Sequence, residues 1–326
     1  MDRLIRLYLL ALLGFLASCG SIQRVGVSST AEIIYQASIE IEKEGNWEMF
    51  KTAVPSNLKL LEGLLEVHGT DKNLLVSLIK GYTGYAFAVH ETLHLEEIWS
   101  GGPSRFHYDQ ALQMYSKALN YGLRYLELEG ITHEQLLKSM REVRGINKLL
   151  SQKLHLKNMR DREAVLFTAQ ALGSLINMQR TDMTIVAQLP VAKEMFDWVC
   201  EFDPQMNFGA CGIFQGAYEA GRPVMMGGNP ELSQKIFINA IEENPHNWLV
   251  PLSYIQLYAL PLYKEDLYKE WKPRFEKWTG DLKAELKWSA VKGKNREAFE
   301  EPRLRFYQAL AIKRFELMKK YENNLF

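Results

Sequence analysis

The sequence lacks a net charge, because its 326 residues hold 39 lysines and arginines against 39 aspartates and glutamates. Nucleic-acid-binding proteins carry a basic excess, so this composition gives no support for a nucleic-acid partner. The sequence also lacks segments of alternating apolar and polar residues bounded by turns, the pattern that indicates strands. These absences favour an all-α protein.

Cysteine is scarce, with three in the chain. Cys19 belongs to the N-terminal segment, which leaves Cys200 and Cys211 in the folded part. We expect these two near consecutive helix ends, where an oxidising compartment would allow a bridge. Because disulfide geometry is strict, the sequence favours two buried thiols over a bridge.

The N-terminus holds a short apolar run at residues 7–15, preceded by charged residues and followed by Leu-Ala-Ser-Cys at 16–19. The run is too short to span a bilayer, and the pattern indicates a secretory signal with a lipobox. We expect lipidation of Cys19, with acyl chains such as palmitate, to anchor the protein to a membrane. Gly20 in place of aspartate favours the outer membrane, facing the periplasm. An uncleaved anchor and a plain secretory signal are the alternatives.

The expected domain organisation follows from this signal. Residues 1–18 form the signal peptide, residues 19–29 the lipidated cysteine and a linker, and residues 30–326 a single α-helical repeat domain. A repeat array grows without a second hydrophobic centre, which favours one domain over two.

Within that domain a pattern of small residue, aromatic residue and small residue recurs at about 40-residue multiples, typical of the second helix of a tetratricopeptide-like unit. Small residues on one helix face allow a neighbouring helix to approach, and the ring fills the gap. The pattern predicts a helical-hairpin repeat solenoid with buried rings. The three copies of the pattern are Ala111-x3-Tyr115-x2-Ala118, Ala192-x3-Phe196-x2-Val199-x4-Pro204 and Ser233-x3-Phe237-x2-Ala240-x4-Pro245.

Start and stop signals predict the individual helices. Asp71, Thr132 with Gln135, and the pair Thr181 and Asp182 are expected start signals of helices. Among the predicted segments are 30–44, 47–53 and 55–68 joined at Pro55, 71–97, 161–180, 190–202, 207–221 and 230–243.

Several of these features together resemble one known family. They are the lipobox, the helical repeats, Phe202-Asp203-Pro204, Phe208-Gly209-Ala210, the run Gly227-Gly228-Asn229-Pro230-Glu231 with Phe237 and Ala240 downstream, and the closing segment 303–319. The chain resembles the T component of tripartite ATP-independent periplasmic (TRAP) transporters.

The resemblance implies a non-enzymatic periplasmic lipoprotein without a cofactor. It would associate with the substrate-binding P component, and its helices would surround a channel or groove for a hydrophobic small molecule. A homo-oligomer is left open. An envelope scaffold without a ligand is an alternative that the sequence does not separate from this one.

Aromatic residues in the central and C-terminal units are the candidate ligand- or partner-binding residues. Tyr218, Trp248 and Tyr254 are expected near first helices, which line the concave side of a solenoid. They would offer apolar area with a polar group. The alternative is that these rings fill the core between repeats.

The pair Gly227-Gly228 precedes a helix that starts at Pro230. A phosphate loop would need a lysine and a serine or threonine here, which are missing. The glycines therefore predict a structural turn between hairpin helices.

One motif favours an enzyme. His90-Glu91-Thr92-Leu93-His94 fits H-E-x-x-H, in which His90 and His94 would hold zinc and Glu91 would activate water. No third ligand follows at the usual spacing. A zinc hydrolase is therefore kept as an alternative function, with His90 and His94 otherwise polar residues on a long helix.

Overall fold

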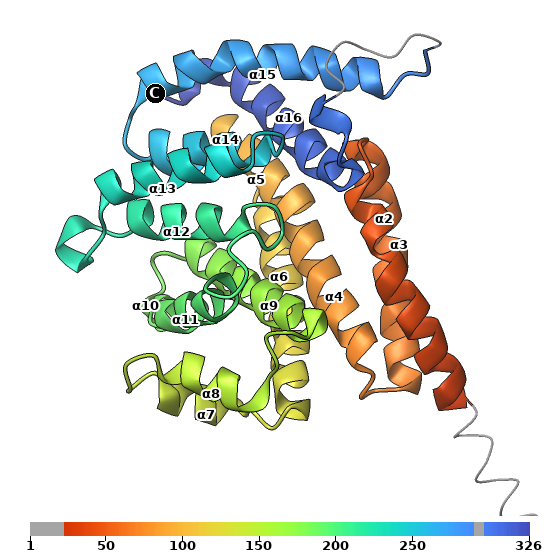
Figure 1. Cartoon of the computed structure of the whole chain (residues 1–326). Helices are drawn as coiled ribbons and strands as arrows, with labels where there is room; N and C mark the ends of the chain where they lie inside the picture. Colours follow the sequence, from red (N-terminus) through yellow and green to blue (C-terminus); the bar gives the residue numbers. More distant parts are fainter. Residues whose placement is uncertain (1–22, 290–296) are drawn as a thin grey trace, which may run out of the picture.

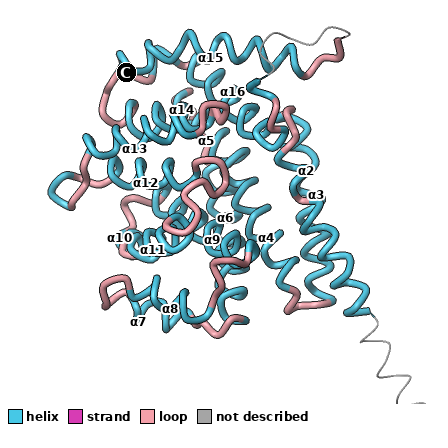
Figure 2. The backbone as a smooth tube through the Cα atoms, viewed as in Figure 1, coloured by secondary structure: helices cyan, strands magenta, loops and turns pink. Residues whose placement is uncertain are grey.

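The computed structural model describes residues 23–289 and 297–326, and in these ranges the backbone is helical with no strand (Figures 1 and 2). The prediction of an all-α fold is confirmed. Within the described ranges, no helix combines the length and the hydrophobicity needed to cross a bilayer. Cys19 and the predicted signal peptide lie outside the described residues.

Residues 23–37 are helical, and the later elements follow in chain order. They are α2 (Ile39–Glu42), α3 (Trp47–Val67), α4 (Lys72–Tyr85), the π-helix η1 (Ala86–Glu91), α5 (Thr92–Trp99), α6 (Phe106–Leu128), α7 (His133–Ser139), α8 (Gly145–Lys153), α9 (Met159–Met178), α10 (Met183–Val186), α11 (Leu189–Cys200), α12 (Ala210–Gly221), the 3-10 helix η2 (Val224–Met226), α13 (Pro230–Glu243), α14 (Leu249–Tyr254), the π-helix η3 (Ile255–Ala259), α15 (Glu265–Glu285), the 3-10 helices η4 (Glu297–Phe299) and η5 (Pro302–Leu304), α16 (Arg305–Lys320) and the 3-10 helix η6 (Glu322–Asn324).

Successive long helices pack side by side, with shorter helices between some of them. α3 packs on α4, α4 on α6, α6 on α9 and α9 on α11, while α12 and α13 form a second pair (Figure 1). The C-terminal helix α16 then returns to the start of the domain, where it contacts α2, α3 and α5 as well as α14 and α15. The two ends of the described chain therefore close on each other around a central space.

The small and aromatic residues of the recurring pattern face the interior, whereas its closing prolines, Pro204 and Pro245, are exposed. Each of the small and aromatic residues is at most 4% exposed, which confirms the predicted burial of the two rings Phe196 and Phe237. The helical-hairpin solenoid itself stays a prediction. The buried set is Ala111, Tyr115, Ala118, Ala192, Phe196, Val199, Ser233, Phe237 and Ala240.

Helix starts are set by short polar side chains, as predicted. Asp71 accepts hydrogen bonds from the backbone of Asn73 and Leu74 at the start of α4. Thr132 and Gln135 form a reciprocal capping box at α7, and Asp182 caps α10. These side chains satisfy amide groups that have no partner within their own helix.

The predicted break at Pro55 is wrong, because α3 runs through it without interruption. A proline inside a helix provides no N–H for the carbonyl four residues earlier, here that of Lys51. The Tyr85 hydroxyl donates to this Lys51 carbonyl at 3.1 Å. A neighbouring helix thus replaces the missing bond, a contact that local sequence does not reveal.

Two further predicted boundaries differ. The expected linker 19–29 is helical from residue 23, and the first helix is interrupted at Ser38 rather than continuous over 30–44. The helix predicted at 71–97 extends to Trp99 and contains a π-helical segment at 86–91. π-helical turns frequently lie at functional sites, and this one borders an internal cavity.

Candidate functional site: an internal cavity

A cavity of about 1120 Å³ lies among the helices that close on each other. Its wall is formed by α2, α3, α4, η1, α9, α11, α12, α14 and α16, so it draws on both ends of the domain. Most of the lining residues are apolar, among them Phe50, Phe167, Ile213, Leu249 and Leu310. A concave, mainly apolar space with few polar groups is the usual form of a small-molecule site.

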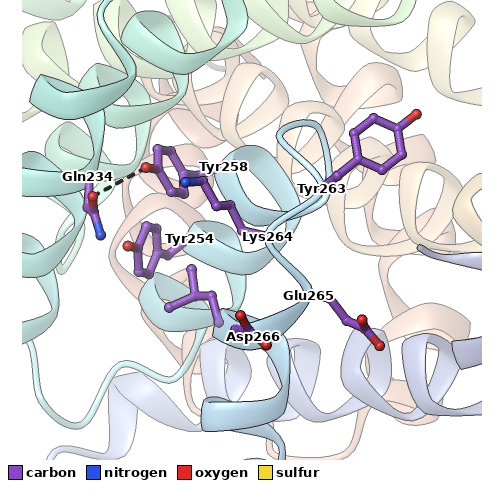
Figure 3. A pocket seen from close by; sticks show the side chains of 8 residues that line it. Gln234, Tyr254, Tyr258, Tyr263, Lys264, Glu265 and Asp266 are labelled. Carbon is purple, nitrogen blue, oxygen red and sulfur yellow. Dashed lines mark hydrogen bonds between the residues drawn. The ribbon is translucent and has the colours of Figure 1, made fainter.

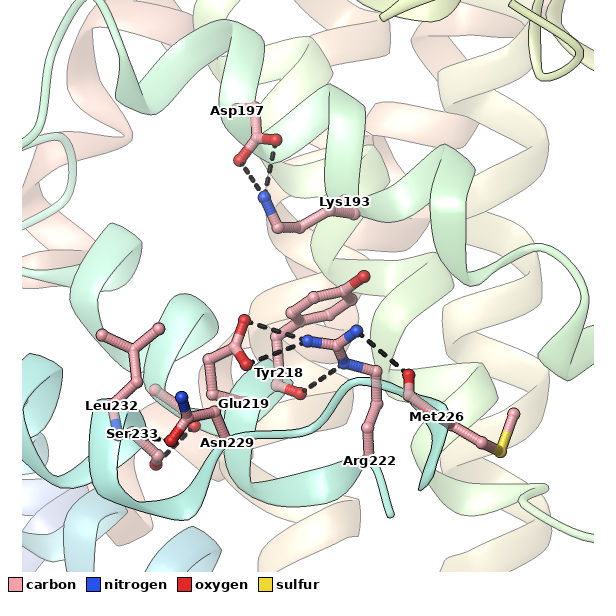
Figure 4. Close-up of polar contacts among 10 residues, drawn as sticks. Lys193, Asp197, Tyr218, Glu219, Arg222, Met226, Asn229, Leu232 and Ser233 are labelled. Atoms are coloured by element: carbon pink, nitrogen blue, oxygen red, sulfur yellow. Dashed lines mark hydrogen bonds and ion pairs between the residues drawn. The ribbon is translucent and has the colours of Figure 1, made fainter. Parts of the chain in front are cut away.

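An aromatic wall runs along one side of this cavity. The ring of Phe196 stacks on that of Phe214 with centroids 3.6 Å apart, and Phe214 stacks on Tyr218 at 6.0 Å. The Arg222 guanidinium lies 3.8 Å from the Tyr218 ring centroid and donates to both oxygens of Glu219 at 2.9 Å (Figure 4). Because Phe214, Tyr218 and Arg222 lie four residues apart on or just after α12, helix periodicity places them in one row.

An ionic group with a buried arginine forms the part of the wall where α16 meets η1. Arg314 is 3% exposed, and its Nη2 lies 3.5 Å from the Glu91 carboxylate. Its Nε donates to the Thr92 hydroxyl at 2.8 Å and its Nη2 to the Phe87 carbonyl at 2.6 Å. The Tyr115 hydroxyl donates to Glu91 at 2.7 Å. Burial, and then Glu91, raises the pKa of Tyr115, so Tyr115 stays a neutral donor.

A second ionic group joins α2, α4 and α9 to η5, the short helix that precedes α16. Glu42 lies 2.7 Å from both Lys80 and Arg303, and Lys80 also lies 3.0 Å from Glu163. Burial acts to lower the pKa of Lys80, but Glu163 and Glu42 outweigh it and raise this pKa above its usual value. Lys80 is therefore a cation, and its charge is neutralised by the two carboxylates.

The cavity opens to solvent where its lining residues become exposed. One group of exposed lining residues, which we call the mouth, consists of Asn177, Arg180, Met183, Pro223 and Met226; other exposed lining residues include Ile41 and Pro261. The mouth residues lie at the end of α9, in α10 and in the η2 connection. Large apolar side chains gather here, since Met183 is 63% and Met226 65% exposed.

A family model for the TRAP transporter T-component matches residues 43–271. This span covers more than half of the chain and most of the cavity wall. The chain belongs to the TRAP transporter T-component family. No curated protein matches it. The resemblance noted from the sequence is thereby confirmed, and the T component is an accessory part of a transport system.

Of the three aromatic residues predicted to bind a ligand or partner, the cavity wall of this T component contains Tyr218. Trp248 is 1% exposed, and its ring stacks on Trp278 with centroids 5.1 Å apart. It fills the core, where neither a ligand in the cavity nor a partner reaches it.

Tyr254 is also buried, at 2% exposure, and stacks on Phe237. It borders a separate small pocket of about 320 Å³, in which Tyr258 donates to Gln234 at 3.3 Å (Figure 3). The expectation of an accessible ring is thus wrong for Trp248 and Tyr254, because both fill space between packed helices.

The turn predicted at Gly227 and Gly228 is present in the T component. Gly227 has φ +84°, a conformation that side chains disfavour. A Cβ on Gly228 would lie 1.9 Å from the Arg222 carbonyl oxygen. The two glycines therefore allow η2 to fold back on α12, which holds Met226 at the mouth.

The H-E-x-x-H residues are engaged elsewhere. Nδ1 of His90 lies 3.0 Å from Nδ1 of His107, and His94 pairs with Glu97 at 3.1 Å. Glu91 faces the cavity and Arg314 rather than the histidines. In the described ranges no three potential ligands are grouped for a metal ion. The arrangement offers no support for the zinc alternative.

The expectation of two free thiols is wrong. Cys200 and Cys211 form a disulfide, with Cα atoms 5.7 Å apart. It joins the end of α11 to the start of α12, the two helices that carry the aromatic wall. Sequence reasoning recognised that the two helix ends approach but gave the strict geometry too much weight.

Sequence reasoning missed Arg314 and the mouth residue Arg180. A signal for Arg314 exists, because Leu310, Arg314 and Met318 follow at intervals of four on one face of α16. Both apolar neighbours are fully buried. A lone arginine between buried apolar positions indicates a buried ionic contact. Arg180 had no such signal, since it follows a helix end like any solvated residue.

Proposed function

We propose that this T component is a lipid-anchored accessory protein that holds a hydrophobic small molecule in its cavity and associates with the substrate-binding P component. The cavity of about 1120 Å³ carries the proposal. Ligand sites typically enclose about 300–1,000 Å³, so the space suffices for a sizeable guest. The apolar wall favours a hydrophobic guest because burial of apolar surface drives its entry.

The mouth supports the association with the P component. Val224 is 71% and Met225 97% exposed, and both adjoin Met226 on η2. Exposed apolar side chains that gather at one place are typical of protein interaction sites, and methionine adapts to varied partner surfaces. A partner docked here would face the opening, so a guest would pass between the two proteins without crossing water.

The proposed location is the periplasmic face of the outer membrane, through lipid on Cys19. The disulfide between Cys200 and Cys211 supports an exported protein, since such bonds persist in oxidising compartments. Glu91, His90 and His94 each contact another side chain, namely Arg314, His107 and Glu97. These contacts favour a non-enzymatic role over a zinc hydrolase. Stoichiometric zinc in the purified protein would contradict that preference.

Capture of the P component tests the association. We expect Met225→Asp to weaken capture strongly, because a carboxylate would be desolvated within an apolar contact. Val143→Asp is the matched control, since Val143 is 87% exposed and does not line the cavity. Equal capture by wild type and the Met225→Asp variant would exclude the exposed η2 surface at the edge of the mouth as the docking site. Lipid extraction of the same preparations tests whether a guest is bound. Absence of an extracted lipid would favour a scaffold without a ligand.

A further inference from the structure

Charge in the cavity wall is unevenly compensated. Nearly every charged lining residue has an opposite charge within ion-pair distance. The compensated groups are Lys80 with Glu42 and Glu163, Glu42 also with Arg303, Arg314 with Glu91, and Arg222 with Glu219. Within each group the positive and negative charges are close to equal in number.

Arg180 is the exception. Its guanidinium donates to the side-chain and backbone oxygens of Asn177, both neutral groups. Among the described residues, the hydrogen-bond partner of this guanidinium is Asn177, and burial, with no contribution from a carboxylate, lowers its pKa. Arg180 therefore leaves a positive charge at the mouth, beside an apolar wall of low dielectric that strengthens its field.

This placement suits one class of guest. The deep part of the cavity is mainly apolar, and the ionic groups in its wall are paired with one another, so it fits an uncharged hydrocarbon body. The mouth offers a guanidinium, whose planar fork matches a carboxylate. We propose that the cavity binds a long-chain amphiphile with a single anionic headgroup, and that Arg180 binds that headgroup. This assignment rests on the hydrophobic guest of the proposed function.

Binding of two probes of equal chain length tests this assignment. The full-length protein is dialysed to equilibrium against radiolabelled palmitate or hexadecanol. We expect wild type to bind palmitate more tightly than hexadecanol, and Arg180→Gln to weaken palmitate binding about tenfold or more, the effect of a lost charge-assisted bond. Hexadecanol binding should stay unchanged in this variant.

Two further variants separate charge at the mouth from other effects. Arg180→Lys keeps the charge and should keep most of the preference for palmitate. Arg141→Gln makes the same charge change at an exposed position outside the wall and should behave as wild type.

Equal binding of both probes by wild type, or an undiminished preference in Arg180→Gln, would overturn the role of Arg180 and leave the hydrophobic guest intact. Failure of wild type to bind either probe would contradict both this assignment and the guest in the proposed function.

Discussion

The guanidinium of Arg314 lies 3.5 Å from the carboxylate of Glu91 in the cavity wall, and this pair joins the C-terminal helix to the π-helix η1. The two residues stand more than 200 positions apart in the sequence. Their contact completes the enclosure that the earlier helices begin. The cavity therefore depends on the packing of α16 against the first helices of the domain.

Breaking this pair should destabilise the protein. Arg314→Met removes a buried cation and leaves the Glu91 carboxylate, whose side chain is 16% exposed, without this partner, which should lower the free energy of unfolding by about 3 kcal/mol, the low end for a buried pair. Lys319→Met is the control, because Lys319 and its partner Glu276 are both exposed and such a pair is worth about 1 kcal/mol or less. Denaturant unfolding measures both, and equal effects would show that the buried pair has no special role.

The ring at the centre of the third copy of the repeat pattern should be equally critical. Phe237 is fully buried against Tyr254, so Phe237→Ala should cost about 3–5 kcal/mol through lost burial and a cavity. Phe106→Ala, at a ring that is 59% exposed, should cost far less. Matching melting curves for the two variants would argue against the assigned packing.

Stability should fall in mild acid because of His90. Burial, and then the neighbouring His107, lowers the pKa of His90 to about 4 from 6.5. Glu97 opposes this shift, while burial also lowers the pKa of His107. The folded state thus binds fewer protons than the unfolded chain, and stability present above pH 6.5 is lost as the pH falls towards 4.

Unfolding measured from pH 7 to pH 4 checks this. His90→Gln should flatten the dependence in that range, whereas His133→Gln, at an exposed residue, should not. An unchanged slope in His90→Gln would assign the acid sensitivity to other groups.

How far the sequence predicted this molecule depends on whether a feature is local. Caps such as Asp71 and Thr132 act within one turn, and their helices begin where predicted. The continuity of α3 through Pro55 was missed because its compensation comes from Tyr85 on another helix.

The site shows the same division. Tyr218 was predicted as a candidate ligand- or partner-binding residue; it lines the cavity, and its role in binding stays a prediction. The burial of Trp248 could not be predicted, because periodicity gives a helix face but not what packs against it. The cavity itself arises from the contact of α16 with the first helices, a relationship that no segment of the sequence contains.

The most direct test of the central claim is mass spectrometry of molecules that co-purify with the protein, compared with a variant whose cavity is filled. Ala217 lines the cavity, and Ala217→Trp should occupy the space beside the aromatic wall. Ala53→Trp adds the same ring at an exposed position of α3. We predict a hydrophobic molecule bound to wild type and to Ala53→Trp but lost from a folded Ala217→Trp. The same molecule retained by Ala217→Trp, or none bound to wild type, would contradict the account.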